Sequence, residues 1–387
     1  MSEIKILYSE PADYFPKDVR EDAFPELEVD SVKYNEIART ILGGILEEAA
    51  DKNIVFSPYS VYTLLNILKD STSGNTRNEV AEFLGIAASD SVDTLSIINR
   101  HLKKDRQFRS VNAALVKNKL KDHINKEYIV MLKEKYGAEF FASADLINDV
   151  NKWVKKQTNG MIPEIADETM KEMVAALLNA VTFKASWKKK YEEDDIGEGD
   201  FTNTDKSLSE VSMMCSTEDH YIENEFFTGF IKPYRGGEFS YMGLRPRKNS
   251  KSFLRRAVRG MSITELYDDA SKAEVRASIP EYKVEFEKNL SSLLKSNGVT
   301  QAFKDDADFT PMSSDTPLKV EKILHKAYIE VDRRGTKASA VTFSEIAIGC
   351  APRLDEVKYV DLDHPFVYAI IHNKTHLPVF LGVVNQL

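Results

Sequence analysis

The stretch from Lys326 to Cys350, close to the C-terminus, places the strongest constraint on the fold. Residues 326–332 alternate apolar and polar side chains, which predicts a β-strand. After Gly335 the period of two continues through residues 336–347. All charges of this second run fall on one face, and the other face holds only small or apolar groups: Thr336, Ala338, Ala340, Thr342, Ser344 and Ile346.

The small face of this run has a physical consequence. Its side chains are too small to anchor a hydrophobic core by themselves, but they suit a strand that slides between two existing strands over a packed core. Larger side chains would overpack that core, and a charge would be buried without a partner. We therefore expect the run that begins at Thr336 to be able to join an existing sheet.

The same region resembles the hinge of the reactive-centre loop of the serpins, a family of mostly protease-inhibiting proteins. The resemblance covers residues 332–342, and Asp363–Ile370 is similar to the strand that follows the loop. It implies that a cleaved loop enters the main sheet as a new strand. The hinge would consist of Gly335, Thr336, Lys337, Ala338, Ser339, Ala340, Val341 and Thr342.

Further motifs extend the resemblance from about residue 32 to the C-terminus. Residues 53–68 predict a strand followed by a helix that Ser57 caps and Pro58 begins, and this segment is similar to a serpin signature. Residues 177–187 match the family strand Asn-Ala-x-x-Phe-Lys-Gly-x-Trp, with alanine where the glycine is usual.

A second group of segments completes the expected fold. Residues 147–160 predict an amphipathic helix that is similar to the helix lying across the main serpin sheet. Residues 238–244, 277–286 and 377–385 predict strands. The resemblance implies an α+β serpin fold with three β-sheets, about eight to nine helices and an exposed reactive-centre loop near the C-terminus.

Length and composition bound the domain organisation. Among 387 residues, 42% are hydrophobic and 29% charged, as in an ordinary globular protein. We expect a single serpin domain over residues 31–387, with the reactive-centre loop at about 335–355. Residues 1–30 are acidic and contain three prolines, so we expect them to be an extension outside the core.

Charge and hydropathy exclude several partners and leave the compartment open. The net charge of −9 argues against nucleic acid or an anionic membrane as the main partner. No apolar run approaches the roughly 18 residues of a membrane helix. The N-terminus has no signal-peptide pattern. An extracellular or cell-surface location follows if a signal peptide was removed, and a cytoplasmic one if Met1 is the native start.

The sequence holds no motif for catalysis. It has no Walker loop, no G-x-S-x-G elbow, no H-E-x-x-H and no paired C-x-x-C, so we predict neither an enzyme nor a cofactor or metal. His372 and His376 are four residues apart, but a hairpin turn explains them better than a metal site. Cys215 is interpreted as a packed thiol and Cys350 as an exposed one.

A basic cluster between the predicted strands offers a second candidate site. Its residues could bind a polyanion, but in an acidic chain a solvated face is the preferred interpretation. The cluster consists of Arg245, Arg247, Lys248, Lys251, Arg255, Arg256 and Arg259.

The resemblance also assigns two polar sites. Ser57, Ser60, Asn179 and His325 match the serpin shutter, the polar cluster beneath the point where the main sheet opens. We expect these residues to have a conformational role, because a hydrogen-bonded cluster can re-pair when strands part.

The second polar site is the breach, where the loop first enters. Trp187 matches its aromatic residue. Serpins commonly carry an acidic residue two before the hinge glycine, paired with a lysine. Here these positions are Arg333 and Glu281, which predicts an ion pair with its charges swapped; the alternative is two solvated charges without contact.

The implied function is suicide-substrate inhibition of a serine protease, in which a monomer traps the covalent acyl-enzyme. The family's usual spacing from the hinge glycine puts the scissile bond at Gly349–Cys350. A shifted register would cut at Ile348 or Ala351, and all of these suit an elastase-like or subtilisin-like pocket, whereas Arg353 would suit a trypsin-like one. The competing hypothesis is a non-inhibitory serpin, a carrier or chaperone, against which the small hinge residues argue.

Overall fold

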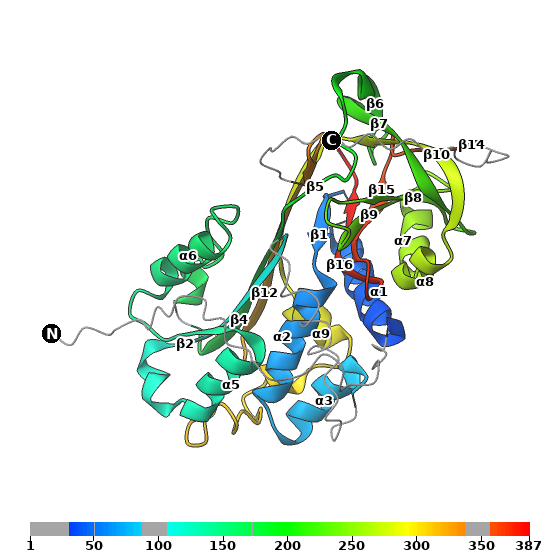
Figure 1. Cartoon of the computed structure of the whole chain (residues 1–387). Helices are drawn as coiled ribbons and strands as arrows, with labels where there is room; N and C mark the ends of the chain where they lie inside the picture. The colour runs from blue at the N-terminus through cyan, green and yellow to red at the C-terminus, as the bar shows by residue number, and fades with distance from the viewer. Residues whose placement is uncertain (1–30, 50, 87–106, 172, 337–356) are drawn as a thin grey trace, which may run out of the picture.

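The computed structural model describes residues 31–49, 51–86, 107–171, 173–336 and 357–387. Two β-sheets and the helices that cover them make up this part of the chain (Figure 1). The α-helices are α1 Ser31–Glu48, α2 Pro58–Asp70, α3 Gly74–Leu84, α5 Lys126–Tyr136, α6 Leu146–Gln157, α7 Lys251–Gly260, α8 Ile263–Asp268 and α9 Ser291–Ser296.

The main sheet contains seven strands in the order β3-β2-β4-β12-β13-β5, with β11 on the other side of β12. Most neighbours run antiparallel, but β2 pairs with β3, and β4 with β12, in parallel. The bounds are β2 Phe108–Val116, β3 Glu139–Phe141, β4 Ala175–Phe183, β5 Ala185–Ser186, β11 Tyr282–Asn289, β12 Lys322–Asp332 and β13 Gly335–Thr336.

The other sheet contains nine strands in the order β1-β16-β15-β9-β8-β7-β10-β14, with β6 also paired to β7. The long strand β7 joins two parts, because it pairs with β6 and β10 along most of its length and with β8 only at its end. The bounds are β1 Ile54–Phe56, β6 Ile196–Thr202, β7 Leu208–Glu223, β8 Phe227–Pro233, β9 Phe239–Pro246, β10 Ser271–Pro280, β14 Val357–Asp361, β15 Phe366–His372 and β16 Leu377–Val384.

The main sheet is buried on both faces. Along β4, Leu177 and Val181 point into the large core that contains α2, whereas Leu178 and Ala180 point into a second core. Helix α6 covers this second face with Trp153 and its neighbours, on the opposite side of the sheet from α2 (Figure 1). Alternation along a strand buried on both sides explains why every residue of β4 is buried.

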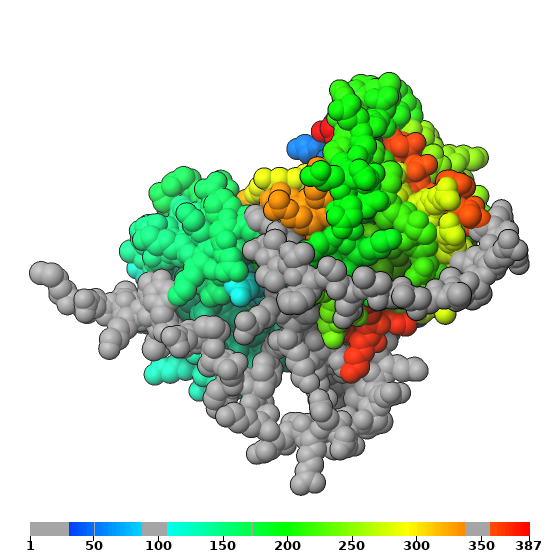
Figure 2. All heavy atoms as spheres, turned by 45° about the horizontal axis from the view of Figure 1, so that its top comes forward, coloured from blue at the N-terminus to red at the C-terminus, as the bar shows by residue number. Residues whose placement is uncertain are grey.

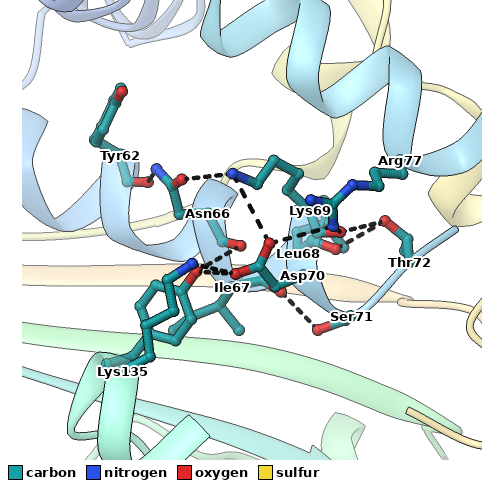
Figure 3. A network of polar contacts seen from close by, with 11 residues as sticks. Tyr62, Asn66, Ile67, Leu68, Lys69, Asp70, Ser71, Thr72, Arg77 and Lys135 are labelled. Atoms are coloured by element: carbon teal, nitrogen blue, oxygen red, sulfur yellow. Dashed lines mark hydrogen bonds and ion pairs between the residues drawn. The ribbon is translucent and has the colours of Figure 1, made fainter. Parts of the chain in front are cut away.

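Helix α2 begins where the sequence predicts. Pro58 is its first residue, and the Ser57 hydroxyl oxygen accepts a hydrogen bond from the Ser60 amide at 3.1 Å. At its other end, Asp70 forms ion pairs with Arg77 of α3 and Lys135 of α5 (Figure 3).

The Asp70 carboxylate holds the ends of three helices together. Lys135 lies 2.7 Å from Oδ2, Arg77 lies 3.2 Å from Oδ1, and the Tyr136 hydroxyl donates to Oδ2 at 2.6 Å. Burial pushes the pKa of this carboxyl up, but the hydrogen bonds from Lys135 and Tyr136 outweigh it and hold the pKa below its ordinary value. Helices α2, α3 and α5 are therefore joined by one partly buried carboxylate.

Two local expectations were wrong. Residues 277–286 are divided at Pro280, because β10 ends there in the nine-stranded sheet and β11 begins at Tyr282 in the main sheet. The thiol of Cys215 is exposed instead of packed. The neighbouring Met214 takes the buried face of β7, so the alternation of the strand turns Cys215 outward.

The expected hairpin around His372 and His376 is present. His372 ends β15 and His376 lies in the turn before β16, as a hairpin requires. No three metal-binding side chains gather in the part of the chain that the structure describes. None of the helices in these ranges has both the length and the apolar character to span a membrane.

Candidate functional site

The parallel contact between β4 and β12 is the centre of the candidate site. Their pairing runs from Ala176 opposite Lys322 to Thr182 opposite Tyr328. A strand placed between two parallel strands can run antiparallel to both. The chain that leaves β12 turns at Arg333 and Arg334 and returns in that antiparallel direction as β13.

The contact between β4 and β12 is the seam of the main sheet, and strand β13 already lies at one end of it. Gly335 and Thr336 pair with β12 on one side and with β5, the continuation of β4, on the other. Thr336 is fully buried, and its hydroxyl lies 2.7 Å from the Tyr234 hydroxyl. The sheet is therefore open for two residues at the hinge and closed further along.

Gly335 has no room for a side chain. Its φ is +144°, and a Cβ atom would lie 2.1 Å from the carbonyl oxygen of Ala185. The Asp332 carboxylate accepts hydrogen bonds from the amides of Arg334 and Gly335, which fixes the turn before the hinge. The end of β12, shown in orange, reaches the surface between the α6 lobe and the green β6–β7 hairpin (Figure 2).

The four residues assigned to the shutter lie together across the seam. His325 and Asn179 are direct neighbours on β12 and β4, and Nδ1 of His325 lies 2.9 Å from Oδ1 of Asn179. Nε2 of His325 accepts from the Ser57 amide at 3.1 Å. The proton of the neutral ring is therefore on Nδ1, which donates to Asn179. Ser60 reaches the same cluster through its hydroxyl group.

Two members of this cluster were missed from the sequence. The Asn179 amide nitrogen donates to Oγ of Ser110 and to Oδ1 of Asn112, both at 2.9 Å, and Ser110 also contacts Ser60 at 3.0 Å. Both residues belong to β2, where Asn112 is paired opposite Asn179. A buried asparagine in an otherwise apolar strand was the signal that could have found them.

The indole of Trp187 anchors the hinge. It is 1% exposed, stacks on Tyr234 at 4.5 Å between ring centroids, and donates from Nε1 to the carbonyl of Asp332 at 2.9 Å. The amides of Trp187 and Tyr191 donate to the carbonyls of Arg334 and Arg333. The segment from Trp187 to Tyr191 thus holds three successive carbonyl groups before Gly335.

A buried ion pair supports this aromatic segment. Nζ of Lys232 lies 2.7 Å from Oε1 of Glu218, and the two side chains are 2% and 8% exposed. The same ammonium lies 4.4 Å from the Tyr191 ring centroid and 5.5 Å from that of Trp187. Burial lowers the pKa of Lys232, although Glu218 opposes that change. This pair was not predicted from the sequence, although a lysine in the apolar strand 227–233 was an available signal.

Arg333 and Glu281 are in contact. Nε of Arg333 lies 3.0 Å from Oε1 of Glu281, and the Arg333 amide donates to the same oxygen at 3.1 Å. Burial pushes the pKa of Glu281 up, but the hydrogen bonds from Arg333 hold it below its ordinary value. The structure therefore contains the predicted ion pair with swapped charges; its role in the breach stays a prediction.

Other residues of the predicted site lie outside the described residues. These are the hinge positions Lys337, Ala338, Ser339, Ala340, Val341 and Thr342 and the candidate reactive-bond residues Ile348, Gly349, Cys350, Ala351 and Arg353. Of the predicted hinge, the structure therefore describes Gly335 and Thr336, together with the contact between β4 and β12.

Comparison with known proteins agrees with this geometry. The family model Serpin (serine protease inhibitor) matches residues 33–387. Neuroserpin of Mus musculus is 30% identical over 358 residues, which cover 86% of this chain and 86% of the relative. Leukocyte elastase inhibitor A of Rattus norvegicus is 29% identical, over 87% of this chain and 94% of the relative. The thermophilic serpin tengpin in its native state has a TM-score of 0.81 at 29% identity, covering 95% of this chain and 96% of that structure.

In the described residues the chain turns back after β12 and pairs as β13 at the end of the contact between the parallel strands β4 and β12. The chain belongs to the serpin family. The family resemblance and the α+β serpin fold predicted from the sequence are confirmed. The count of three sheets treats the two parts of the nine-stranded sheet, joined by β7, as separate sheets.

We predict that His325 makes stability depend on pH. Burial lowers the pKa of its ring from 6.5 to about 3. Between these values the unfolded chain binds a proton that the folded chain does not. The His325 contribution is complete above about pH 6.5 and falls by about 1.4 kcal/mol per pH unit below it. Urea unfolding of the wild type and of His325→Gln between about pH 7 and pH 5 measures this slope, which the variant should flatten.

The matched control for this prediction is His123→Gln. His123 is exposed, with its Nδ1 3.1 Å from Asp315, so its replacement should leave the slope almost unchanged. Parallel stability curves for the wild type and His325→Gln would contradict the assignment of a buried neutral ring.

We predict that Gly335→Ala displaces β13. The added methyl group would collide with the carbonyl of Ala185, so the change should cost about 2–4 kcal/mol of unfolding free energy. Gly298→Ala is the control, since Gly298 also has a positive φ, of +94°, but has no atom near its Cβ position. It should cost about 1–2 kcal/mol. Equal shifts of the urea midpoint in the two variants would show that the close approach at Gly335 has no separate effect.

Proposed function

We propose that this serpin is a suicide-substrate inhibitor of serine proteases and not an enzyme. A target protease attacks the reactive-centre loop and forms an acyl-enzyme with it. After cleavage the freed segment enters the main sheet between β4 and β12, carrying the protease with it. Distortion of the protease then prevents hydrolysis of the acyl-enzyme, so the covalent complex persists.

The observation that carries the proposal is the position of β13. Its two residues already lie between β12 and β5, in the direction of an inserted strand. Thr336 is buried there, and it begins the face of small side chains that continues at Ala338 and Ala340. Insertion would therefore extend a strand that already exists, with side chains that the core can accept.

The free energy expected from loop insertion also supports the proposal. Insertion would form about a dozen backbone hydrogen bonds at roughly 0.5–1.5 kcal/mol each, a gain on the order of 10 kcal/mol. The contact between β4 and β12 must first be broken, which supplies a barrier. The uncleaved protein is thus kinetically trapped in a state that is not its most stable one.

We infer separate roles for the two polar clusters. The shutter residues Ser57, Ser60, Asn179 and His325 hold the closed seam and can re-pair around an inserted strand. At the breach, Trp187 and the pair Arg333–Glu281 hold the hinge until cleavage. The exposed ion pair by itself is worth only about 0–1 kcal/mol, so the buried indole is the stronger anchor.

The choice of protease depends on the loop sequence. We propose Gly349–Cys350 as the scissile bond, with Ile348 and Ala351 as neighbouring alternatives. Small or apolar residues at these positions favour an elastase-like or subtilisin-like target. Leukocyte elastase inhibitor A, by its name, acts on an elastase, which supports this choice. Cleavage after Arg353 by a trypsin-like enzyme is the alternative outcome.

The unit that acts is proposed to be the monomer. The serpin domain would span residues 31–387, with the acidic segment 1–30 as an extension outside it. One monomer would form one covalent complex with one protease. The proposed partners include neither nucleic acid nor a membrane, in agreement with the net charge of −9.

One experiment tests the proposal directly. The protein is mixed with an elastase-like, a subtilisin-like and a trypsin-like protease, and complexes that survive denaturant are sought by gel electrophoresis. Mass spectrometry of the released C-terminal peptide identifies the scissile bond. We expect a stable complex and a cleaved form that melts far above the intact one. If the cleaved protein melts no higher and no complex forms, the chain is a non-inhibitory serpin.

We predict that Ala338→Asp converts the inhibitor into a substrate. The carboxylate would have to be buried on the small face of the inserted strand, so insertion should slow while cleavage continues. Lys337→Asp is the matched control, because Lys337 belongs to the opposite face of the run. The number of inhibitor molecules consumed per protease inhibited should rise severalfold for Ala338→Asp only. Full inhibition by Ala338→Asp would contradict the insertion mechanism.

A further inference from the structure

A cavity of about 210 Å³ lies away from the seam and the hinge. It is bordered by the C-terminal half of α1, the first turns of α7, the turn between β6 and β7, and the chain beside β9, β15 and β16. None of its lining residues belongs to the main sheet. The cavity is therefore a separate feature of the molecule that loop insertion does not explain.

The cavity has an apolar floor. Leu46 from α1 and Leu254 from α7 contribute aliphatic side chains, and Pro246 and Pro365 contribute proline rings. Leu254 is 5% exposed, so the floor continues into the core of the protein. A cavity of this volume has room for one small apolar group, such as a single ring, and is smaller than the usual site for a drug-sized ligand.

The polar lining of the cavity carries charge of one sign. Lys206, Lys248, Lys251 and Arg255 all line it, and the lining residues of the described chain include no carboxylate. This is unexpected in a protein with 61 acidic and 52 basic residues. Like charges around a partly enclosed space raise the local potential, so the cavity favours an anion.

Arg255 is the cation that points to a ligand. Lys251, Arg255 and Arg259 follow one another at intervals of four and share one face of α7. Lys251 is paired with Asp51 and Arg259 with Glu47. Within the described residues, Arg255 between them makes no ion pair or hydrogen bond, although it is half-buried.

Within the residues that the structure describes, Lys206 and Lys248 form no ion pair. Nζ of Lys206 donates to the backbone carbonyl of Asn249 at 3.0 Å, and Lys248 lies 5.8 Å from the ring centroid of Phe253. Neither contact supplies a negative charge. An anion at the rim could thus pair with Arg255 and lie near both lysines, while an apolar group attached to it filled the floor.

We propose that this cavity binds a small organic anion that combines a phosphate or sulfate head with one apolar ring. The head would contact Arg255, Lys248 and Lys206, and the ring would contact Leu46 and Leu254. Arg255 is suited to this role, because its guanidinium group can donate two parallel hydrogen bonds to a phosphate or sulfate. The proposal is independent of protease inhibition, because it involves neither the loop nor the main sheet.

Isothermal titration calorimetry on the intact protein tests the site, with phenyl phosphate as the probe. We expect binding at one site per chain, weakened by added salt. Phenol, which lacks the anion, and inorganic phosphate, which lacks the ring, should each bind at least about tenfold more weakly. Failure to detect saturable binding of phenyl phosphate at millimolar concentration would overturn the proposal, as would equally tight binding of inorganic phosphate.

Variants of α7 and the adjacent loop provide the control. Arg255→Gln should weaken the binding of phenyl phosphate by about tenfold. Arg256→Gln makes the same change at the next residue, whose guanidinium lies over Phe226 and Phe253 and does not line the cavity. Its affinity should stay within about twofold of the wild type. Lys248→Gln removes a second proposed contact at an exposed position, so it should weaken binding of phenyl phosphate severalfold without disturbing the fold. Equal affinities of Arg255→Gln and Arg256→Gln would rule out the site.

Discussion

The parallel contact between β4 and β12 is the interaction on which the rest of the structure depends. It closes the main sheet, yet it joins two strands that come from distant parts of the chain and have no direct connection. Parallel pairing is slightly less stable per residue than antiparallel pairing. A returning strand between them would replace one parallel contact by two antiparallel ones. The proposed insertion would therefore exchange this contact for a more stable arrangement.

Polar groups buried between β4 and β12 fit both the observed closed sheet and its proposed opening. An apolar seam would be held by packing alone, whereas the hydrogen bond from His325 to Asn179 specifies the register of β4 against β12. Ser57 and Ser110 bring further partners from α2 and β2. Such a network is stable only while each donor has an acceptor. The proposed separation of the strands would therefore need new partners for these groups.

The main residues between β4 and β12 could be identified from the sequence, but several of their hydrogen-bond partners could not. The small face after Gly335 followed from the spacing of the side chains, whereas Ser57, Asn179 and His325 followed from the resemblance to the serpin family. Asn112 stands out as a polar residue in an apolar stretch, but its partner and the part of Ser110 could not be assigned, because they depend on the register of β2 against β4. The face of a strand that points to solvent could not be predicted either. Cys215 is exposed beside the buried Met214, and the alternation of a strand does not say which of the two side chains is buried.

The sequence marks Lys232 as unusual in its strand, but its partner could not be predicted, for a related reason. Lys232 lies in an apolar strand. Its charge can be buried there because Glu218 of β7 pairs with it in a region of low dielectric constant. Removing either partner would leave a buried charge unpaired beneath Trp187 and Tyr191, the segment that holds the carbonyl groups before Gly335. The hinge is thus fixed from two directions, by the surface pair of Arg333 with Glu281 and by this buried pair. Because only the buried pair is protected from solvent and salt, the hinge should remain anchored when the surface pair is screened.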